Sequence, residues 1–322
     1  MTILVAEIGW NFLGKLSLAK KMILEAKKAG SDAVKFQIWD PKYLKNGKWD
    51  YDGRRKIYEK AFLDEKKYKI LRQFSKKNSI KCFASAFNLD GIKLLKKCGD
   101  KWIKIPSHEA YNFELINFAL NNFQKIMISA GCLKKNELNK LIKLISSKKI
   151  YKSKTTLLHC VSSYPLKTTD CNFQKFKYIK SKLNKVGYSG HLQGIEDSVY
   201  ALFNGAEIIE KHFTIDKNYS RFRDHKLSAD LKEMKKIVQG IRRIDNMKGK
   251  YSKIINKDEN KNFNLMRRSL YAKKNIKAGE KFTLLNTNFL RPRKKLSEIN
   301  RKFFFSTVSK KSIIKDKIIK NN

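Results

Sequence analysis

The feature that most constrains the fold is a regular alternation of short apolar, β-prone runs with amphipathic helical patterns. Strands that alternate with helices predict a parallel sheet covered by helices. The expected strands are Ile3–Ile8, Ala33–Ile38, Ile80–Ala84, Trp102–Ile105, Lys125–Ser129, Thr155–Val161, Lys185–Tyr188 and a run between Gly205 and Thr214. Eight strand–helix units close a (β/α)8 barrel, and 322 residues can hold one such barrel with a small appendage.

An open, doubly wound sheet is the main alternative to a barrel. Such a sheet commonly carries a glycine-rich phosphate turn after its first strand, and the segment Glu7-Ile-Gly-Trp10 does not match one. We therefore expect an α/β fold, a (β/α)8 TIM barrel. Residues from Trp39 to about Asp64 form an unusually long connection, which is typical of a lid or a binding loop.

The chain changes character after the last barrel helix, which we expect over Leu231–Ile244. The stretch that follows is polar and charged, typical of a linker, and beyond it come short strands at Arg267–Glu280, Phe282–Arg291 and Phe303–Val308. We expect a catalytic barrel domain over 1–245, a linker over 246–262 and a small β-rich domain over 263–322. A unit of that size has little core of its own.

The formal net charge of +43 raises the question of a polyanionic partner. Most of the charge comes from lysines spread over nearly every helix, which is typical of solvated helix faces, and no RNA- or DNA-binding motif is visible. We expect no nucleic-acid partner. A basic, non-catalytic nucleic-acid-binding protein remains the alternative from another functional class, and it predicts binding that weakens steeply with salt.

Membrane spans and disulfides are not expected. No apolar run approaches the ~18 residues that a spanning helix needs. The five cysteines are odd in number and scattered, and no pair has a C-x-x-C spacing. This usage favours reduced thiols and a cytoplasmic protein.

Polar side chains recur near the carboxyl ends of the expected strands, where a barrel would bring them to one pocket. They are Glu7, Lys35, Gln37, Ser85, Lys104, Ser107, Glu109, Ser129, Ser162, Tyr164, Ser189, His191, Glu210 and His212. Lys35 and Lys104 lie within otherwise apolar strands. A buried lysine is costly unless an anion accompanies it, so this pair favours an anionic ligand.

Glu210 and His212 are two residues apart on one strand and therefore point to the same face. An acid and an imidazole there suit a metal ion or a sugar hydroxyl, and His191 lies just past the preceding apolar run. The alternative is that both histidines form ordinary hydrogen bonds in a core. For His108 and His159 we expect such a structural role, and beside His225 the better functional candidate is Asp224.

Six segments occur in an order that resembles the N-acetylneuraminate (sialic acid) synthase family. They are Ala6-Glu-Ile-Gly9, Asp32-Ala-Val-Lys-Phe-Gln37, Ile103-Lys-Ile-Pro-Ser-His-Glu109, Leu157-Leu-His-Cys-Val-Ser-Ser-Tyr-Pro165, Val186-Gly-Tyr-Ser-Gly-His191 and Ile209-Glu-Lys-His-Phe-Thr214. Arg267-Arg-Ser-Leu270 and Leu290-Arg-Pro292 resemble the antifreeze-like (SAF) domain that ends members of this family. The resemblance covers nearly the whole chain.

The resemblance implies condensation of phosphoenolpyruvate with an open-chain N-acetylmannosamine-type aldose, giving a nine-carbon α-keto acid and phosphate with C–O cleavage. It implies a divalent metal, Mn²⁺ or else Mg²⁺, held by His191 and His212 as a Lewis acid for the sugar aldehyde. Phosphoenolpyruvate would be held by Lys104, Ser85, Ser107, Ser162, Ser189 and, at its carboxylate, Lys35. Glu7 and Glu109 would handle water and protons with the two lysines as further catalytic groups. The sugar would be positioned by Gln37, Tyr164, Glu210, Asp224 and an Arg291 from the partner subunit of a domain-swapped homodimer.

Departures from the family pattern fall mainly where the acceptor sugar would be held. Gly190 stands where many members carry Asp beside the metal histidine, and Ser162 where Asn is common. Arg221-Phe-Arg223 and Arg293-Lys-Lys-Leu296 replace glycine-containing turns. Synthases of the legionaminate or pseudaminate type, which act on other acylated hexoses, are the alternative that the resemblance leaves open.

Overall fold

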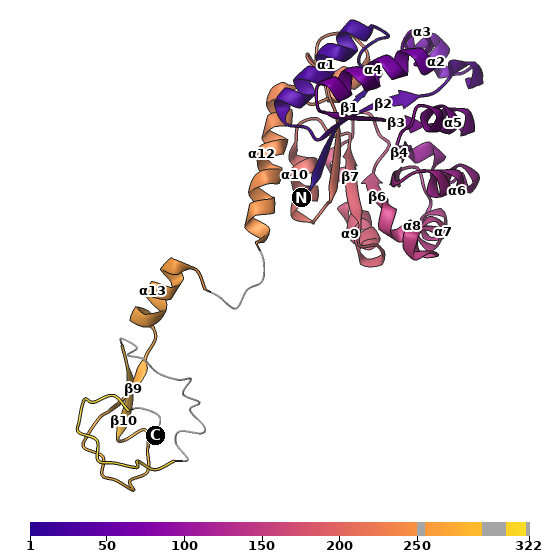
Figure 1. The fold of residues 1–322 in the computed structure, drawn as a ribbon. Coiled ribbons are helices and arrows are strands. Elements are labelled where there is room, and N and C mark those ends of the chain that lie inside the picture. The colour runs from indigo at the N-terminus through magenta and orange to yellow at the C-terminus, as the bar shows by residue number, and fades with distance from the viewer. Residues whose placement is uncertain (250–254, 292–306, 320–322) are drawn as a thin grey trace. The chain divides into compact units, whose positions relative to one another are not determined.

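In the computed structural model, eight parallel strands form a closed barrel in the order β1 to β8, and helices surround them (Figure 1). The strands are β1 (Ile3–Gly9), β2 (Ala33–Ile38), β3 (Lys81–Ala86), β4 (Trp102–Ile105), β5 (Lys125–Ser129), β6 (Thr155–Cys160), β7 (Val186–Gly190) and β8 (Ile208–His212). The structure describes residues 1–249, 255–291 and 307–319. The predicted TIM barrel is confirmed.

The helices of the barrel follow their strands along the chain. They are α1 (Leu16–Ala29), η1 (Pro41–Tyr43), α2 (Lys48–Tyr51), α3 (Arg54–Lys60), α4 (Glu65–Lys77), α5 (Leu89–Lys97), η2 (Ser107–Glu109), α6 (Phe113–Asn122), α7 (Lys135–Ser146), α8 (Lys149–Lys154), η3 (Thr168–Asp170), α9 (Phe173–Lys182), α10 (Glu196–Phe203), α11 (Arg223–Leu227) and α12 (Leu231–Lys248). Among the described residues, every helix is too short or too polar to cross a lipid bilayer.

Two apolar layers hold the barrel together. Residues such as Phe36, Ile103 and Ile209 point outward from the strands and pack under the helices in the main core. A second, smaller cluster fills the inside of the barrel, and its buried members are Val5, Ala33, Phe83, Met127, Leu158 and Ile208. Successive side chains of a strand alternate faces. The inward residues that follow this inner cluster along each strand must therefore line the carboxyl end of the barrel.

Contacts between residues divide the chain into two units, Met1–Gly249 and Lys250–Asn322. The second unit contains α13 (Lys257–Met266) and a small antiparallel sheet of β9 (Ser269–Ala272) and β10 (Thr287–Leu290). Leu270, Ile276 and Phe282 are in its small buried core. A separate small β-rich unit was predicted and is present, and this sheet fits a SAF-like domain; that identity and the boundaries at 245 and 262 stay predictions.

Several local expectations differ from the structure. The helix α13 begins inside the stretch that we expected to be a linker, because Asn256 caps it by accepting a hydrogen bond from the backbone N–H of Glu259. The strand expected at Lys185–Tyr188 runs instead from Val186 to Gly190. The expected strand Phe303–Val308 and the turn Arg293–Leu296 lie outside the described residues, apart from 307 and 308.

His159 lies in the core, as predicted. It is fully buried on β6 between Phe173 and Tyr188, with Nε2 2.8 Å from the carbonyl oxygen of Cys171. Burial lowers its pKa from 6.5 to about 4, although the Cys171 carbonyl opposes the change. The folded protein therefore holds this imidazole neutral.

Acidification should destabilise the protein partly through His159. Between pH 6.5 and about 4 the unfolded chain binds a proton that the folded chain does not, so stability is fully present above pH 6.5 and falls as pH drops. The difference between the two pKa values of His159 corresponds to a loss of about 3 kcal/mol in the free energy of unfolding. In urea denaturation at pH 7 and pH 4.5, the variant His159→Gln should lose less stability than the wild type; equal losses would show that another group governs this range.

Candidate active site

The carboxyl ends of the strands enclose a cavity of about 430 Å³, and each of the eight strands contributes a lining side chain. Of the residues singled out from the sequence, Glu7, Lys35, Gln37, Ser85, Lys104, Ser107, Glu109, Ser129, Tyr164, Ser189, His191, Glu210, His212 and Asp224 line it. The backbone register explains this convergence. Glu7 pairs with Lys35 on one side and with His212 on the other, so inward side chains of neighbouring strands lie at the same height.

Two lysines and two glutamates form a buried charged cluster in this cavity. The ammonium of Lys35 lies 2.6 Å from Glu7 Oε2, donates to Ser85 Oγ at 2.7 Å and lies 3.8 Å from Glu210 Oε2. The ammonium of Lys104 pairs with Glu210 and lies 3.4 Å from Ser189 Oγ. Ser189 donates to Glu210 at 2.9 Å. The four charges balance one another, which is how the fold tolerates them inside.

The two ion pairs differ in their protonation behaviour. Burial opposes the charge of Glu210, but Lys104 and Lys35 outweigh it and lower its pKa to about 2. Burial alone would lower the pKa of Lys104, but Glu210, Cys160 and Glu7 together outweigh burial and raise it. For Glu7 and Lys35 burial prevails, so the pKa of Glu7 is raised and the pKa of Lys35 is lowered. Lys104 and Glu210 therefore both keep their charges near neutral pH, whereas Glu7 with Lys35 is better suited to exchanging a proton.

The imidazoles of His191 and His212 lie next to each other, with ring centroids 5.5 Å apart. His191 Nδ1 is 2.8 Å from the carbonyl oxygen of Val161, and Tyr164 lies 4.2 Å from the same ring. His212 is buried, and its Nδ1 has no hydrogen-bond partner among the described residues. Burial and the neighbouring His191 lower the pKa of His212 well below its usual range, so the ring is neutral.

A neutral imidazole with a buried, unpaired nitrogen fits the requirements of a metal ligand. Within residues 1–249, 255–291 and 307–319, no group of three or more His, Cys, Asp and Glu side chains is arranged to hold a metal ion. His191 and His212 could therefore supply only part of a coordination sphere, and substrate or water would supply the rest. This is the open type of site that catalytic metals use.

The hydroxyl groups of Ser107 and Ser162 both lie close to Gly131, which follows β5. A Cβ at Gly131 would lie 2.5 Å from Ser107 Oγ and 2.6 Å from Ser162 Oγ, so any other residue would have to displace these side chains. Ser162 itself is not part of the cavity lining. Sequence reasoning missed Gly131, although a glycine two residues after a strand is a signal for a close backbone approach.

The wall around Tyr164 contains one of the departures expected to affect the sugar, the turn Arg221-Phe-Arg223. Arg223 lies over the Tyr164 ring, 4.7 Å from its centroid, and its Nε lies 3.4 Å from Asp224 Oδ1. Burial raises the pKa of Asp224. Gln37, which was also expected to position the sugar, lies on β2 and donates to Glu7 Oε1 at 2.7 Å. Arg223 therefore belongs to the cavity, where the sequence indicated only an altered turn.

An aromatic wall, formed by Trp10, Trp39, Tyr58 and Phe87, covers another side of the cavity. Trp10 lies 4.3 Å from Tyr58, and Trp39 stacks on Phe87 with ring centroids 5.8 Å apart. Trp39 and Tyr58 come from the long connection after β2, together with Leu44, Trp49 and Arg54 of the lining. This confirms that the connection borders the pocket. The individual aromatic residues were missed, because loop residues carry no periodic pattern.

Of the other residues singled out, Glu109 and His108 lie at the cavity rim, and His225 and Arg291 are not part of the cavity lining. Glu109 is half-buried at the cavity rim, and burial raises its pKa. His108 is exposed at this rim beside Phe87, so the expected core or second-layer hydrogen-bonding role was wrong. His225 is buried and hydrogen-bonded to Thr214. Arg291 is exposed after β10 in the second unit, and its role at a site stays a prediction.

A family model and two relatives of this chain agree on one protein family. Residues 22–253 match the model of the NeuB family. An N,N'-diacetyllegionaminic acid synthase of Campylobacter jejuni is 34% identical over 99% of this chain and 99% of its own. A pseudaminic acid synthase of the same species is 32% identical over 90% of this chain and 87% of its own.

A solved structure extends this similarity to the fold. The N-acetylneuraminic acid (sialic acid) synthetase of Leptospira borgpetersenii, crystallised in complex with citrate, is 32% identical and superposes with a TM-score of 0.72. The match covers 81% of this chain and 89% of that one.

Proposed function

Because this chain belongs to the NeuB family of nonulosonic acid synthases, we propose that it condenses phosphoenolpyruvate with an open-chain N-acylated hexosamine. The products are a nine-carbon α-keto acid and phosphate. The observation that carries the proposal is the convergence of Lys35, Lys104, His191 and His212 on one cavity. Two ammonium groups suit a phosphorylated carboxylate, and paired imidazoles suit a metal next to an aldehyde.

In this proposal the lysines bind the two ends of phosphoenolpyruvate. Lys104, with Ser85, Ser107, Ser162 and Ser189, holds the phosphate, and Lys35 holds the carboxylate. Each ammonium then exchanges a carboxylate partner, Glu210 or Glu7, for the substrate anion. Because Gly131 has no Cβ, the hydroxyl groups of Ser107 and Ser162 can both lie close to its backbone.

The carbon–carbon bond forms between C3 of phosphoenolpyruvate and the aldehyde carbon of the acceptor, whose oxygen takes up a proton to become a hydroxyl group, and an oxocarbenium ion is left at C2. Water adds at C2, and the tetrahedral intermediate loses phosphate by breaking the C2–O bond. Glu7 is the main candidate to accept the proton of that water because its pKa is raised by burial, and Glu109 is a second acid at the rim. His191 and His212 would hold a divalent ion, Mn²⁺ or else Mg²⁺, which would supply Lewis acidity at the aldehyde oxygen.

The acceptor is positioned by Gln37, Tyr164, Glu210 and Asp224. An N-acetylmannosamine-type aldose is the first candidate. A diacylated acceptor is the second candidate, because the N,N'-diacetyllegionaminic acid synthase of Campylobacter jejuni matches 99% of this chain. Phosphoenolpyruvate contains no nitrogen, so a product with two N-acetyl groups must receive both nitrogens from its acceptor. The aromatic wall favours it, since its rings can pack against an additional acyl methyl group. In the assembled enzyme, a domain-swapped homodimer, Arg291 of one subunit completes the acceptor site of the other.

The test is phosphate release from phosphoenolpyruvate in the presence of Mn²⁺ and a panel of acylated hexoses, with the products identified by mass spectrometry. Release with a mono- or diacylated hexosamine, together with a product heavier than that sugar by the mass of one pyruvic acid, supports the proposal and identifies the acceptor. Silence with every sugar, alongside DNA binding that weakens steeply with salt, would instead support the nucleic-acid-binding alternative.

A further inference from the structure

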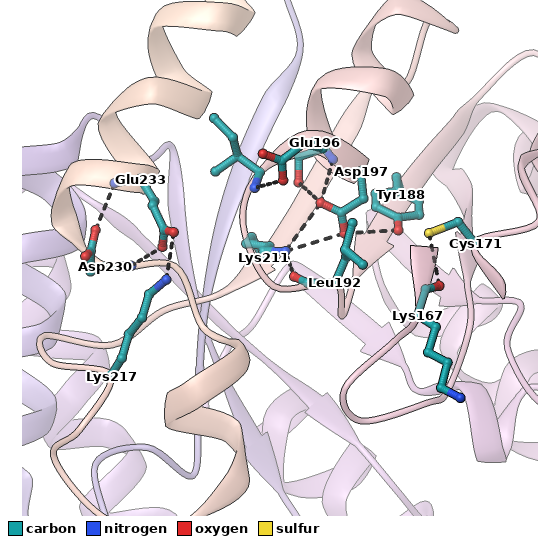
Figure 2. A network of polar contacts seen from close by, with 12 residues as sticks. Lys167, Cys171, Tyr188, Leu192, Glu196, Asp197, Lys211, Lys217, Asp230 and Glu233 are labelled. Carbon is teal, nitrogen blue, oxygen red and sulfur yellow. Dashed lines mark hydrogen bonds and ion pairs between the residues drawn. The ribbon is translucent and has the colours of Figure 1, made fainter. Parts of the chain in front are cut away.

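A buried polar cluster lies between β7, β8 and the start of α10 (Figure 2). We define the Lys211 cluster as the side chains of Lys211, Asp197 and Tyr188 with the carbonyl oxygen of Leu192. The ammonium of Lys211 donates to that carbonyl and lies 3.3 and 3.4 Å from the two carboxylate oxygens of Asp197. Tyr188 donates to Asp197 Oδ2 at 3.1 Å. None of these residues lines the cavity.

Burying the charges of the Lys211 cluster has a large desolvation cost, so the cluster is an inefficient means of stabilising the contact between two strands. The side chains of Lys211 and Asp197 are both 0% exposed, so both charges lose their hydration. Apolar side chains of similar volume commonly stabilise a fold as well as a buried ion pair does. What the charged groups add is direction, because each hydrogen bond fixes where a particular atom lies.

The atoms that the cluster fixes are next to the two imidazoles of the cavity. Lys211 immediately precedes His212 on β8, and its side chain points to the opposite face of the strand. Leu192 immediately follows His191. The carbonyl of His191 itself accepts a hydrogen bond from the N–H of Leu166 at 3.2 Å, so two consecutive backbone carbonyls, those of His191 and Leu192, are held next to its ring.

We propose that the Lys211 cluster positions His191 and His212 relative to each other. A single ammonium group links the residue after one imidazole to the residue before the other. Lys211, Asp197 and Tyr188 are therefore positioning residues that touch no substrate. Their effect on metal binding rests on the proposed function, whereas their effect on the two rings does not.

Gly190 gives the cluster its space. A Cβ at this position would lie 2.4 Å from Asp197 Oδ2 and 2.8 Å from Tyr188 Cε1. Gly190 thus leaves space for the carboxylate that α10 supplies. The variant Gly190→Ala must displace Asp197 or Tyr188, and it should disturb the imidazoles in the same way as loss of the ion pair.

The decisive variant removes both charges at once, as Lys211→Met with Asp197→Asn. Lys211→Met alone leaves a buried carboxylate without its cation and is expected to unfold more easily. The double variant has no unpaired charge, and the amide oxygen that it introduces on α10 can still accept from Tyr188, so its thermal midpoint should recover towards the wild type. The Leu192 carbonyl nevertheless loses its donor, and the two rings lose their link.

Two readouts report on the rings in the full-length protein. In spectra of histidine-labelled protein without metal, the ring signals of His191 and His212 should shift or split in the double variant, while the signal of His108 on the far rim stays in place. Titration with Mn²⁺ alone should show affinity reduced about 10- to 100-fold, the usual effect of groups that orient metal ligands.

A matched pair of tyrosine variants separates positioning from stability. Tyr188→Phe and Tyr68→Phe each remove a hydrogen bond to a buried aspartate, since Tyr68 donates to Asp100 at 2.6 Å. Only Tyr188→Phe should move the His191 and His212 signals. A folded double variant with wild-type ring signals and wild-type Mn²⁺ affinity would overturn the proposal. Failure of the wild type to release phosphate with any acceptor would count against the proposed function, and the ring signals would still test the cluster.

Discussion

Lys104→Met is expected to raise the KM for phosphoenolpyruvate by about 100-fold or more, because a buried charge-assisted contact contributes about 2–5 kcal/mol. The wild-type cluster has two cations and two carboxylates, and the variant leaves Glu7 and Glu210 facing Lys35 alone. The site then carries a net negative charge that repels the substrate. The measurement is a comparison of steady-state kinetics and direct phosphoenolpyruvate binding.

Two further variants distinguish a loss of substrate binding from a loss of folding. Lys104→Met with Glu210→Gln is neutral overall, so it should fold and still bind phosphoenolpyruvate poorly. Lys125→Met removes a half-buried lysine at the opposite end of the barrel, on β5, and should leave the KM unchanged. Normal binding by the Lys104 variant would refute the assignment of the phosphate site.

His212→Ala is expected to lower kcat by about 1,000-fold, because the loss of a metal ligand removes the main stabilisation of charge on the aldehyde oxygen. Phosphoenolpyruvate binding should change little, since Lys35 and Lys104 remain. Chelation of the metal with EDTA should abolish the activity of the wild type and should not lower the activity of the variant further. Kinetics with and without Mn²⁺ provide the measurement.

His159→Asn is the matched control for this variant. His159 is also a buried imidazole on a barrel strand, but it packs outside the barrel against Phe173 and Phe176. Its replacement should affect stability and leave kcat close to the wild type. If His212→Ala turned over like His159→Asn, the two imidazoles would not form a metal site.

The barrel was predictable because strand periodicity and helix spacing are encoded locally. The same rule predicted that Glu210 and His212 share one face of their strand, and both line the cavity. The apolar neighbours of Lys35 and Lys104 also indicated that these charges would be buried. Their partners could not be assigned, because pairing across the barrel depends on strand register.

The missed features depend on contacts between distant segments. Trp10 and Trp39 meet only because two connections fold over the same rim. Lys211 faces outward between His212 and Glu210, and its partner Asp197 comes from a helix, so no motif links them. The departure at Gly190 also became interpretable only when Asp197 was seen beside it.

The most direct test of the central claim follows the oxygen that bridges carbon and phosphorus in phosphoenolpyruvate. With this oxygen labelled as ¹⁸O, and with Mn²⁺ and an acylated hexosamine present, the account predicts that the label appears in the released phosphate, as detected by ³¹P NMR. Phosphate without the label would mean that the P–O bond breaks, and that result would contradict the proposed condensation.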